Sequence, residues 1–276
     1  MSRFIAIANQ KGGVGKTTTA INLAASLAAA EVPTLLVDCD PQANSTSGLG
    51  LARDPARFSS YHLITGQSTL DQTARPTEVE NLFLAPSHKN LTGANIELVN
   101  LEDREFRLRH ALQDARSRFD FVILDCPPAL DLLTLNALVA ADSILIPMQA
   151  EYFALEGISD LLDTMERVRQ NFNPQLEIEG VVVTMLDERI NLAQSVLGEL
   201  KTFFGDKLFA TTIPRNIRLA EAPSFGQPAL VYDARSKGAE SYIRLAKELL
   251  NRHNLRAAQA ANAPETTEAA SADASR

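Results

Sequence analysis

A glycine-rich segment near the start of the chain constrains the fold more than any other feature. It follows the apolar residues 4–8 and leads directly into a helical pattern. The segment reads Asn9-Gln10-Lys11-Gly12-Gly13-Val14-Gly15-Lys16-Thr17-Thr18. Glycines let a backbone curl so that its N–H groups converge on an anion, and the N-terminus of the next helix adds positive potential. This strand–loop–helix order therefore predicts a phosphate-binding loop, with Lys16 on the β- and γ-phosphates and the Thr17 hydroxyl on Mg²⁺.

Short apolar runs alternate with longer helical patterns over most of the chain. The strand candidates are residues 4–8, 34–38, 82–85, 121–124, 143–147, 178–184 and 208–213. The helix candidates are residues 18–30, 91–100, 104–118, 132–140, 155–171, 192–204 and 237–252. Because the strand candidates are continuously apolar, both of their faces should be covered. The pattern predicts an α/β fold with a doubly wound, mostly parallel sheet, helices on both faces and ligands at the carboxyl ends of the strands.

Composition sets the domain organisation. The 276 residues are 45% hydrophobic, enough for a core, and we expect a single domain over residues 1–256. Residues 257–276 are rich in alanine, carry acidic residues and contain no large apolar side chain. Such a segment cannot offset its ordering entropy by burial, so it is predicted to be a disordered tail. The two cysteines, Cys39 and Cys126, cannot form a disulfide framework, which favours a reducing cytoplasm.

The loop departs from the standard phosphate-loop pattern at two positions. Gln10 stands where that pattern has a glycine, and a second lysine, Lys11, opens the loop. In these respects the segment resembles the deviant Walker A ATPases, whose loop has the form KGGxGK[ST]. The resemblance implies that ATP is held between two subunits and that Lys11 reaches the partner's nucleotide, with Gly12 allowing the close approach. The alternative that Lys11 is a solvated loop charge remains open. The expected nucleotide-binding residues are Lys11, Gly12, Gly13, Val14, Gly15, Lys16, Thr17 and Thr18.

Acidic residues follow two of the apolar strand candidates. Asp38 and Asp40 end the segment 34–40, and Asp125 ends the segment 121–125. Carboxylates at the carboxyl ends of strands beside a phosphate loop are placed to meet Mg²⁺ and water. By resemblance, Asp40 orients or activates the attacking water, Asp38 supports it, and Asp125 acts as a Walker B residue that holds Mg²⁺ through a water. Because Asp40 precedes Pro41, a turn or helix-cap role is the alternative.

Three further segments resemble ParA/Soj partition ATPases within this group. They are residues 184–192, 213–224 and 232–239, and the resemblance extends over about residues 3–250. It implies that Pro214 and Asn216 contact the adenine base and that Arg189 and Arg218 bind DNA.

The distribution of charge also favours DNA binding, independently of the resemblance. Residues 189–256 contain eleven Lys/Arg and six Asp/Glu, in a chain whose net charge is −8. A local basic face on an acidic protein suits phosphate-backbone binding, although ordinary solvated helix charges would give the same count. The sequence shows no recognition helix or zinc finger, which favours sequence-independent contacts.

The sequence thus predicts a Mg²⁺-dependent ATPase with slow intrinsic turnover that acts in chromosome or plasmid partitioning. We expect an ATP-bound homodimer that binds double-stranded DNA non-specifically and leaves it on hydrolysis stimulated by a ParB-like centromere-binding protein. Its expected location is the cytoplasm, at the nucleoid, without membrane association. The alternatives are a MinD-like positioning ATPase acting on a membrane or polar protein scaffold, and a nucleotide switch with negligible hydrolysis.

Overall fold

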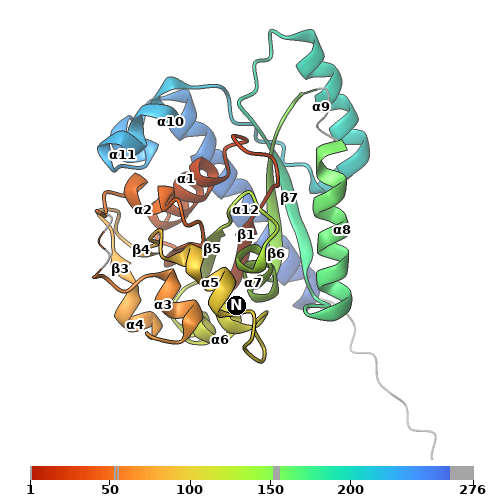
Figure 1. The fold of residues 1–276 in the computed structure, drawn as a ribbon. Helices are drawn as coiled ribbons and strands as arrows, with labels where there is room; N and C mark the ends of the chain where they lie inside the picture. Colours follow the sequence, from red (N-terminus) through yellow and green to blue (C-terminus); the bar gives the residue numbers. More distant parts are fainter. Residues whose placement is uncertain (1, 53, 55, 152–155, 262–276) are drawn as a thin grey trace, which may run out of the picture.

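A seven-stranded sheet forms the centre of the molecule (Figure 1). The computed structural model describes residues 2–52, 54, 56–151 and 156–261. The strands are β1 (Arg3–Ile7), β2 (Thr34–Asp38), β3 (Arg75–Pro76), β4 (Leu82–Ala85), β5 (Phe121–Asp125), β6 (Ser143–Gln149) and β7 (Glu177–Thr184). Their spatial order is β3-β4-β2-β5-β1-β6-β7, and each pairing in this sheet is parallel except β3–β4. From β1 the chain winds outward in both directions, which confirms the predicted doubly wound sheet.

Helices cover both faces of this sheet. The α-helices are α1 (Lys16–Ala29), α2 (Asn44–Gly48), α3 (Ser60–Thr65), α4 (Leu70–Thr73), α5 (Leu91–Glu97), α6 (Arg107–Ala111), α7 (Leu132–Ala140), α8 (Glu156–Asn171), α9 (Asn191–Phe204), α10 (Ile217–Glu221), α11 (Ala229–Tyr232) and α12 (Lys237–Ala261). Three short 3₁₀ helices are η1 (Gln113–Ser117), η2 (Gly205–Lys207) and η3 (Ala222–Phe225). In Figure 1, α8 and α9 stand beside β7 at the right, and α10 and α11 lie together at the upper left.

Alternate side chains of the central strands pack in two separate hydrophobic cores, one on each face of the sheet. Ile5 and Ile7 of β1 pack in a cluster with α1 and α12, whereas Phe4 and Ala6 pack in a second cluster with α5 to α9. All four side chains are at most 2% exposed. Because successive side chains of a strand point to opposite faces, a strand covered on both sides must be apolar throughout. This explains the continuous apolar runs in the sequence.

The segment 208–213, predicted to be a strand, is not one. It forms an isolated bridge from Leu208 to Val181, and its Phe209 and Ile213 amides donate to the carbonyls of Val181 and Val183 in β7, each at 2.8 Å. The amides of Ala210 and Thr211 donate instead to the carboxylate of Glu248 in α12, both at 2.9 Å. A side chain therefore takes the donors that a strand ladder would need.

Several predicted helix bounds also differ, among them that of α5, which ends at Glu97 rather than at residue 100, and two differences are large. The region 104–118 forms α6 and η1 rather than one helix, and α6 begins only at Arg107 because buried Asn136 of α7 accepts a hydrogen bond from the Leu108 amide and donates one to the Arg104 carbonyl. These tertiary bonds replace bonds that a continuous helix would make. The last helix, α12, continues past residue 256 to Ala261, and residues 262–276 of the predicted tail lie outside the described residues.

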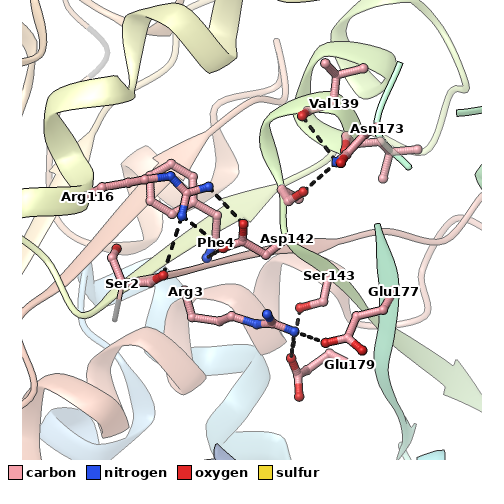
Figure 2. A network of polar contacts seen from close by, with 12 residues as sticks. Ser2, Arg3, Phe4, Arg116, Val139, Asp142, Ser143, Asn173, Glu177 and Glu179 are labelled. Atoms are coloured by element: carbon pink, nitrogen blue, oxygen red, sulfur yellow. Dashed lines mark hydrogen bonds and ion pairs between the residues drawn. The ribbon is translucent and has the colours of Figure 1, made fainter. Parts of the chain in front are cut away.

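A polar network closes the amino end of the sheet (Figure 2). Arg3 at the start of β1 pairs with Glu177 and with fully buried Glu179 of β7, and Glu179 also accepts a hydrogen bond from the Ser143 hydroxyl at 2.8 Å. Beside it, Arg116 binds both oxygens of Asp142. These contacts join β1, β6 and β7 at the end opposite the phosphate loop. Ion pairs and hydrogen bonds therefore stabilise the amino ends of the strands, while the loop lies at their carboxyl ends. None of the described helices is both long and apolar enough to cross a bilayer.

Candidate nucleotide-binding site

The glycine-rich loop connects β1 to α1 at the carboxyl end of the sheet. Gly13 and Gly15 have φ of 76° and 87°, in the left-handed region where a side chain is strained. The hydroxyl of Thr184 at the end of β7 donates to the Val14 carbonyl at 2.8 Å. The Asn9 amide group donates to the Pro147 carbonyl of β6 at the same distance. The ends of two strands therefore fix the course of the loop before any ligand binds.

The two loop lysines lie in different surroundings. Lys16 is only 8% exposed, and its ammonium donates to the Lys11 carbonyl at 3.0 Å. Burial lowers the pKa of Lys16, against the attraction of Asp125 and Asp40. The Lys11 ammonium instead forms an ion pair with Glu151 beyond β6, and both side chains are about half exposed. Lys16 is thus held inside the loop, while Lys11 lies at its outer surface.

Two buried aspartates stand side by side behind the loop. Asp38 and Asp125 are register partners on β2 and β5, and both are fully buried. Burial raises the pKa of each carboxyl, and the neighbouring charge of Asp125 raises that of Asp38 further. Two hydroxyl groups of helix α2 partly offset the cost of burying these carboxyls. The Thr46 hydroxyl donates to Asp38 and the Ser45 hydroxyl donates to Asp125 Oδ2, each at 2.7 Å. The other oxygen of Asp125, Oδ1, is buried and accepts no hydrogen bond from the described residues.

Asp40 makes the turn contact expected as the alternative from the sequence, and it also lies close to the phosphate loop. Its Oδ1 accepts a hydrogen bond from the Gln42 amide at 2.8 Å, which is the turn contact expected of an aspartate before a proline. It is also buried, at 8% exposed, and close enough to the ammonium of Lys16 to act on its pKa. The turn contact therefore holds a carboxylate in place at the loop.

The predicted adenine-contact residues lie beside the end of β7. Pro214 forms an isolated bridge with Leu186. The Asn216 side chain accepts from the Arg218 amide at 2.9 Å and caps α10. Met185, which the sequence analysis did not single out, has a φ of 52°, and its methyl group would lie 3.7 Å from a Cβ on Gly15. This strained residue joins the β7 end to the phosphate loop.

The predicted DNA-contact arginines do not converge with the loop residues. Arg189 is 89% exposed and binds both oxygens of Asp187. Arg218 pairs with Glu221 at 2.8 Å and Asp233 at 3.3 Å. Both are surface side chains whose charge is partly neutralised by neighbouring acids.

Sequence reasoning missed the residues that support the site from outside the motif. Ser45, Thr46, Thr184 and Glu151 belong to this group. A signal existed only for the first two, because the run of hydroxyl side chains at residues 45–47 directly follows the acidic strand end. Thr184, which begins the segment 184–192 but was given no role there, reaches the loop from the end of β7, and Glu151 reaches it from the residues after β6; both are distant from the loop in the sequence.

A parallel sheet, a two-lysine phosphate loop at the start of α1 and carboxylates at the ends of adjacent strands together define a P-loop nucleoside triphosphatase fold. Comparison with known proteins identifies the branch. A family model described as an AAA domain matches residues 2–178. The chain belongs to the ParA/Soj family of chromosome partitioning ATPases.

Individual relatives agree over nearly the full length of the chain. The chromosome partitioning protein ParA of Myxococcus xanthus is 52% identical over 252 residues, which cover 91% of this chain and 89% of that protein. The sporulation initiation inhibitor protein Soj of Bacillus subtilis is 51% identical, with 90% and 98% covered. A solved structure of the Mycobacterium smegmatis cobyrinic acid a,c-diamide synthase, with an ATP analogue and magnesium bound, is 34% identical. It has a TM-score of 0.80 and covers 92% of this chain and 96% of its own.

Proposed function

We propose that this chain is an ATP-driven DNA-partitioning switch. ATP and Mg²⁺ join two protomers, the homodimer binds double-stranded DNA without sequence preference, and a ParB-like protein stimulates hydrolysis and release. The protein works in the cytoplasm, at the nucleoid. The observation that carries the proposal is the two-lysine loop whose buried Lys16 lies close to the carboxylates of Asp125 and Asp40, because this arrangement suits a bound triphosphate with its Mg²⁺.

The loop supplies the phosphate contacts. The β- and γ-phosphates bind to its backbone N–H groups from Gly12 to Thr18 and at the N-terminus of α1, as in other phosphate loops that lead into a helix. The Lys16 ammonium now donates to a loop carbonyl, so a phosphate oxygen replaces one hydrogen bond by a stronger, charge-assisted one. Burial of Lys16 increases this gain, because water screens the interaction less.

The surroundings of Asp125 fit Mg²⁺. Its buried Oδ1 lacks a hydrogen-bond partner within the described chain, and the Thr17 hydroxyl acts on the same carboxyl. Oxygen donors of this kind are the ligands that Mg²⁺ prefers, with the remaining positions left to phosphates and water. The described residues contain no group of three His, Cys, Asp or Glu side chains that could hold a metal ion unaided. When bound, Mg²⁺ neutralises charge on the phosphates during transfer.

Asp40 and Lys11 complete the proposed catalytic set. Asp40, fixed by the Gln42 amide, orients the water that attacks the γ-phosphorus and accepts its proton. Lys11 leaves Glu151 and binds the nucleotide of the partner subunit, so the triphosphate contacts both protomers. Loss of the γ-phosphate removes contacts of both lysines and weakens the dimer. Turnover is slow until a partner protein completes the site.

DNA retardation measured with ATP, with ADP and without nucleotide tests the proposal. The wild type should bind a DNA duplex of arbitrary sequence with ATP only, and Lys16→Ala should not bind under any condition. Co-sedimentation with anionic vesicles, measured in the same nucleotide states, tests the alternative that the protein binds a membrane. Equal DNA binding in all nucleotide states, or ATP-dependent binding to vesicles instead of DNA, would reject the proposed function.

A further inference from the structure

A cavity with a volume of about 640 Å³ lies on the opposite face of the sheet from α1 and α12. Helix α7, which contacts α5, α6 and α8, forms its floor. Leu132, Leu135 and Leu138 line this floor, three residues apart and therefore on one side of the helix. The turn after α5 and the second half of α8 form the sides. The described residues that line the cavity include none of the phosphate loop, so it is separate from the nucleotide site.

The apolar surface of the cavity continues beyond it. Half of the fourteen lining residues are apolar, and two of them, Val99 and Leu130, are 47% and 37% exposed. Ile96 and Leu101, which flank Val99 in the chain, are 77% and 43% exposed. Large apolar side chains that gather in this way mark interaction sites on soluble proteins. A small metabolite would leave the flanking side chains uncovered, which favours a larger occupant.

The charges of the cavity suit an acidic occupant. Both lining acids are already engaged, because Glu105 pairs with Arg104 at 2.9 Å and Asp131 caps α7. Arg167 of α8 also lines the cavity, and its side chain makes no ion pair or hydrogen bond with any described residue. This includes Asp163, which lies one turn earlier on the same helix. An acidic group can therefore pair with Arg167 without displacing another carboxylate.

Two further polar side chains favour a peptide over a hydrocarbon chain. Thr164, one turn before Arg167, brings a hydroxyl that can donate and accept. Asn95 Nδ2 donates to Asp131 Oδ2 at 2.7 Å, which fixes the orientation of the amide because a carboxylate only accepts. Asn95 Oδ1 is thereby left as a buried acceptor without a donor in the described chain. Turned toward the cavity that Asn95 lines, this oxygen can accept a main-chain N–H, which a peptide carries and an acyl chain lacks.

We propose that the cavity and its apolar edge bind a peptide segment of a partner protein in which large apolar side chains flank an acidic residue. The apolar side chains pack on α7 and against Val99 and Leu130, and the acidic residue pairs with Arg167. Residues 262–276 of the chain itself do not fit this description, because they contain acids but no large apolar side chain. The inference goes beyond the proposed function and does not rest on it, since it requires neither ATP nor DNA.

Selection of a random peptide library on the full-length protein without nucleotide tests the proposal. Peptides that also bind Thr164→Trp, in which the indole fills the cavity, are discarded. The peptides that remain should combine large apolar residues with Asp or Glu. The affinity of one such peptide, labelled and measured by fluorescence anisotropy, should fall at least about tenfold in Thr164→Trp and in Arg167→Glu. The control Arg109→Glu makes the same change of charge at an exposed residue of α6 outside the cavity, and it should alter the affinity less than about twofold.

An exchange of charge across the contact makes the test independent of any single variant. A peptide whose acidic residue is replaced by lysine should bind Arg167→Glu more tightly than it binds the wild type. The urea unfolding midpoint of Arg167→Glu should stay close to that of the wild type. If every selected peptide also binds Thr164→Trp, if the remaining peptides are basic, or if the exchange of charge restores no affinity, the proposal is wrong.

Other occupants give distinct results. If sodium dodecanoate binds the wild type but not Thr164→Trp, and no peptide remains after the discarding step, the cavity holds an acyl chain. If the wild type sediments as a dimer without nucleotide and Thr164→Trp sediments as a monomer, this face joins two copies of the chain. Either result overturns the assignment to a partner peptide.

Discussion

The buried aspartates show how single hydrogen bonds sustain this site. Asp38 and Asp125 are neighbours on adjacent strands, and neither forms an ion pair with any described residue. Two carboxyls in such a position resist ionisation, and their pKa values are raised. The hydroxyls of Ser45 and Thr46 are therefore structural requirements of the site, because a buried carboxylate that loses a donor keeps its full desolvation cost.

Replacing Ser45 by alanine should measure that requirement. The substitution removes the 2.7 Å hydrogen bond to Asp125 Oδ2 from a carboxyl whose Oδ1 has no hydrogen-bond partner among the described residues. We expect the free energy of unfolding without nucleotide to fall by about 2 kcal/mol. Ser47→Ala is the matched control, since the Ser47 hydroxyl donates to main-chain carbonyls of its own helical turn, and it should cost less than about 1 kcal/mol. Equal costs in urea titrations would contradict this account.

The motif residues of the site could be predicted from the sequence, and their supports could not. Lys16, Asp40 and Asp125 are marked by their positions at the ends of apolar runs, and parallel strands bring such ends together. Glu151 carries no such mark. Its pairing with Lys11 depends on how the chain leaves β6, which neither composition nor periodicity specifies.

At the scale of elements, α2 links the aspartates to the lobe of α10, η3 and α11. The contact is made by main chains: a Cβ on Gly226 would lie 2.5 Å from the Gly50 Cα and 3.0 Å from the Gly50 nitrogen. Gly226 also has a φ of 68°. Two backbones can approach this closely only when side chains are absent. The contact therefore joins the turn that follows α2 to the turn that follows η3.

We expect Gly226→Ala to lower the free energy of unfolding by about 2–4 kcal/mol, because left-handed strain adds to a clash with main-chain atoms that cannot move aside. Gly66→Ala provides the control. Gly66 has a φ of 77°, but its new Cβ would meet only the end of the flexible Arg107 side chain. It should cost about 1 kcal/mol, mostly strain. Urea titration of both variants measures the two losses in the free energy of unfolding. Equal losses would show that the clash with Gly50 adds nothing to the cost of the left-handed conformation.

Glu248 connects α12 to the segment 208–213. Burial opposes its ionisation, but hydrogen bonds from the amides of Ala210 and Thr211 and from Arg252 outweigh burial, and its pKa is lowered. A carboxyl with a lowered folded-state pKa stabilises the fold above its unfolded value of 4.5, and this contribution is lost as the pH falls through the folded value.

Glu248→Gln should accordingly destabilise the protein in a pH-dependent way. At pH 7 we expect a loss of about 1–2 kcal/mol in the free energy of unfolding, since a neutral amide cannot accept both main-chain bonds as strongly. The difference from the wild type should shrink as the pH is lowered below 4.5. Unfolding by urea at a series of pH values measures it, and a difference that stays constant with pH would exclude the charge as its cause.

The helices that the sequence predicts well are those with a run of apolar residues of sufficient length and a clear start signal. Helix α7 was predicted with its observed bounds, Leu132–Ala140, and its start is fixed by the Asp131 cap. Short helices such as α2 and α10 span only five residues each, too few for an apolar face to repeat. The segment 208–213 has the composition of a strand, but Glu248 supplies its hydrogen bonds from a helix distant in the sequence. Local patterns cannot reveal such a partner.

At the scale of the whole molecule, the position of Lys11 bears on assembly. Its ion pair with Glu151 is half exposed, and pairs of this kind contribute little to folding stability. Removal of Lys11 should therefore leave the protomer intact while it removes the contact that we propose between protomers. This separation of folding from assembly makes the proposed ATP-dependent dimer directly testable.

Sedimentation velocity of Asp40→Ala saturated with ATP and Mg²⁺ should show a dimer, because the nucleotide bridge persists when hydrolysis slows by about a hundredfold or more. Asp40→Ala/Lys11→Ala should remain a monomer under the same conditions and should retain ATP, since Lys16 and the loop amides still hold the phosphates of its own protomer. Its urea unfolding should match that of Asp40→Ala within about 0.5 kcal/mol. If the double variant dimerises as well as the single one, Lys11 acts only within its own chain. If Asp40→Ala hydrolyses ATP at the wild-type rate, another group orients the attacking water, and the catalytic role proposed for Asp40 is wrong.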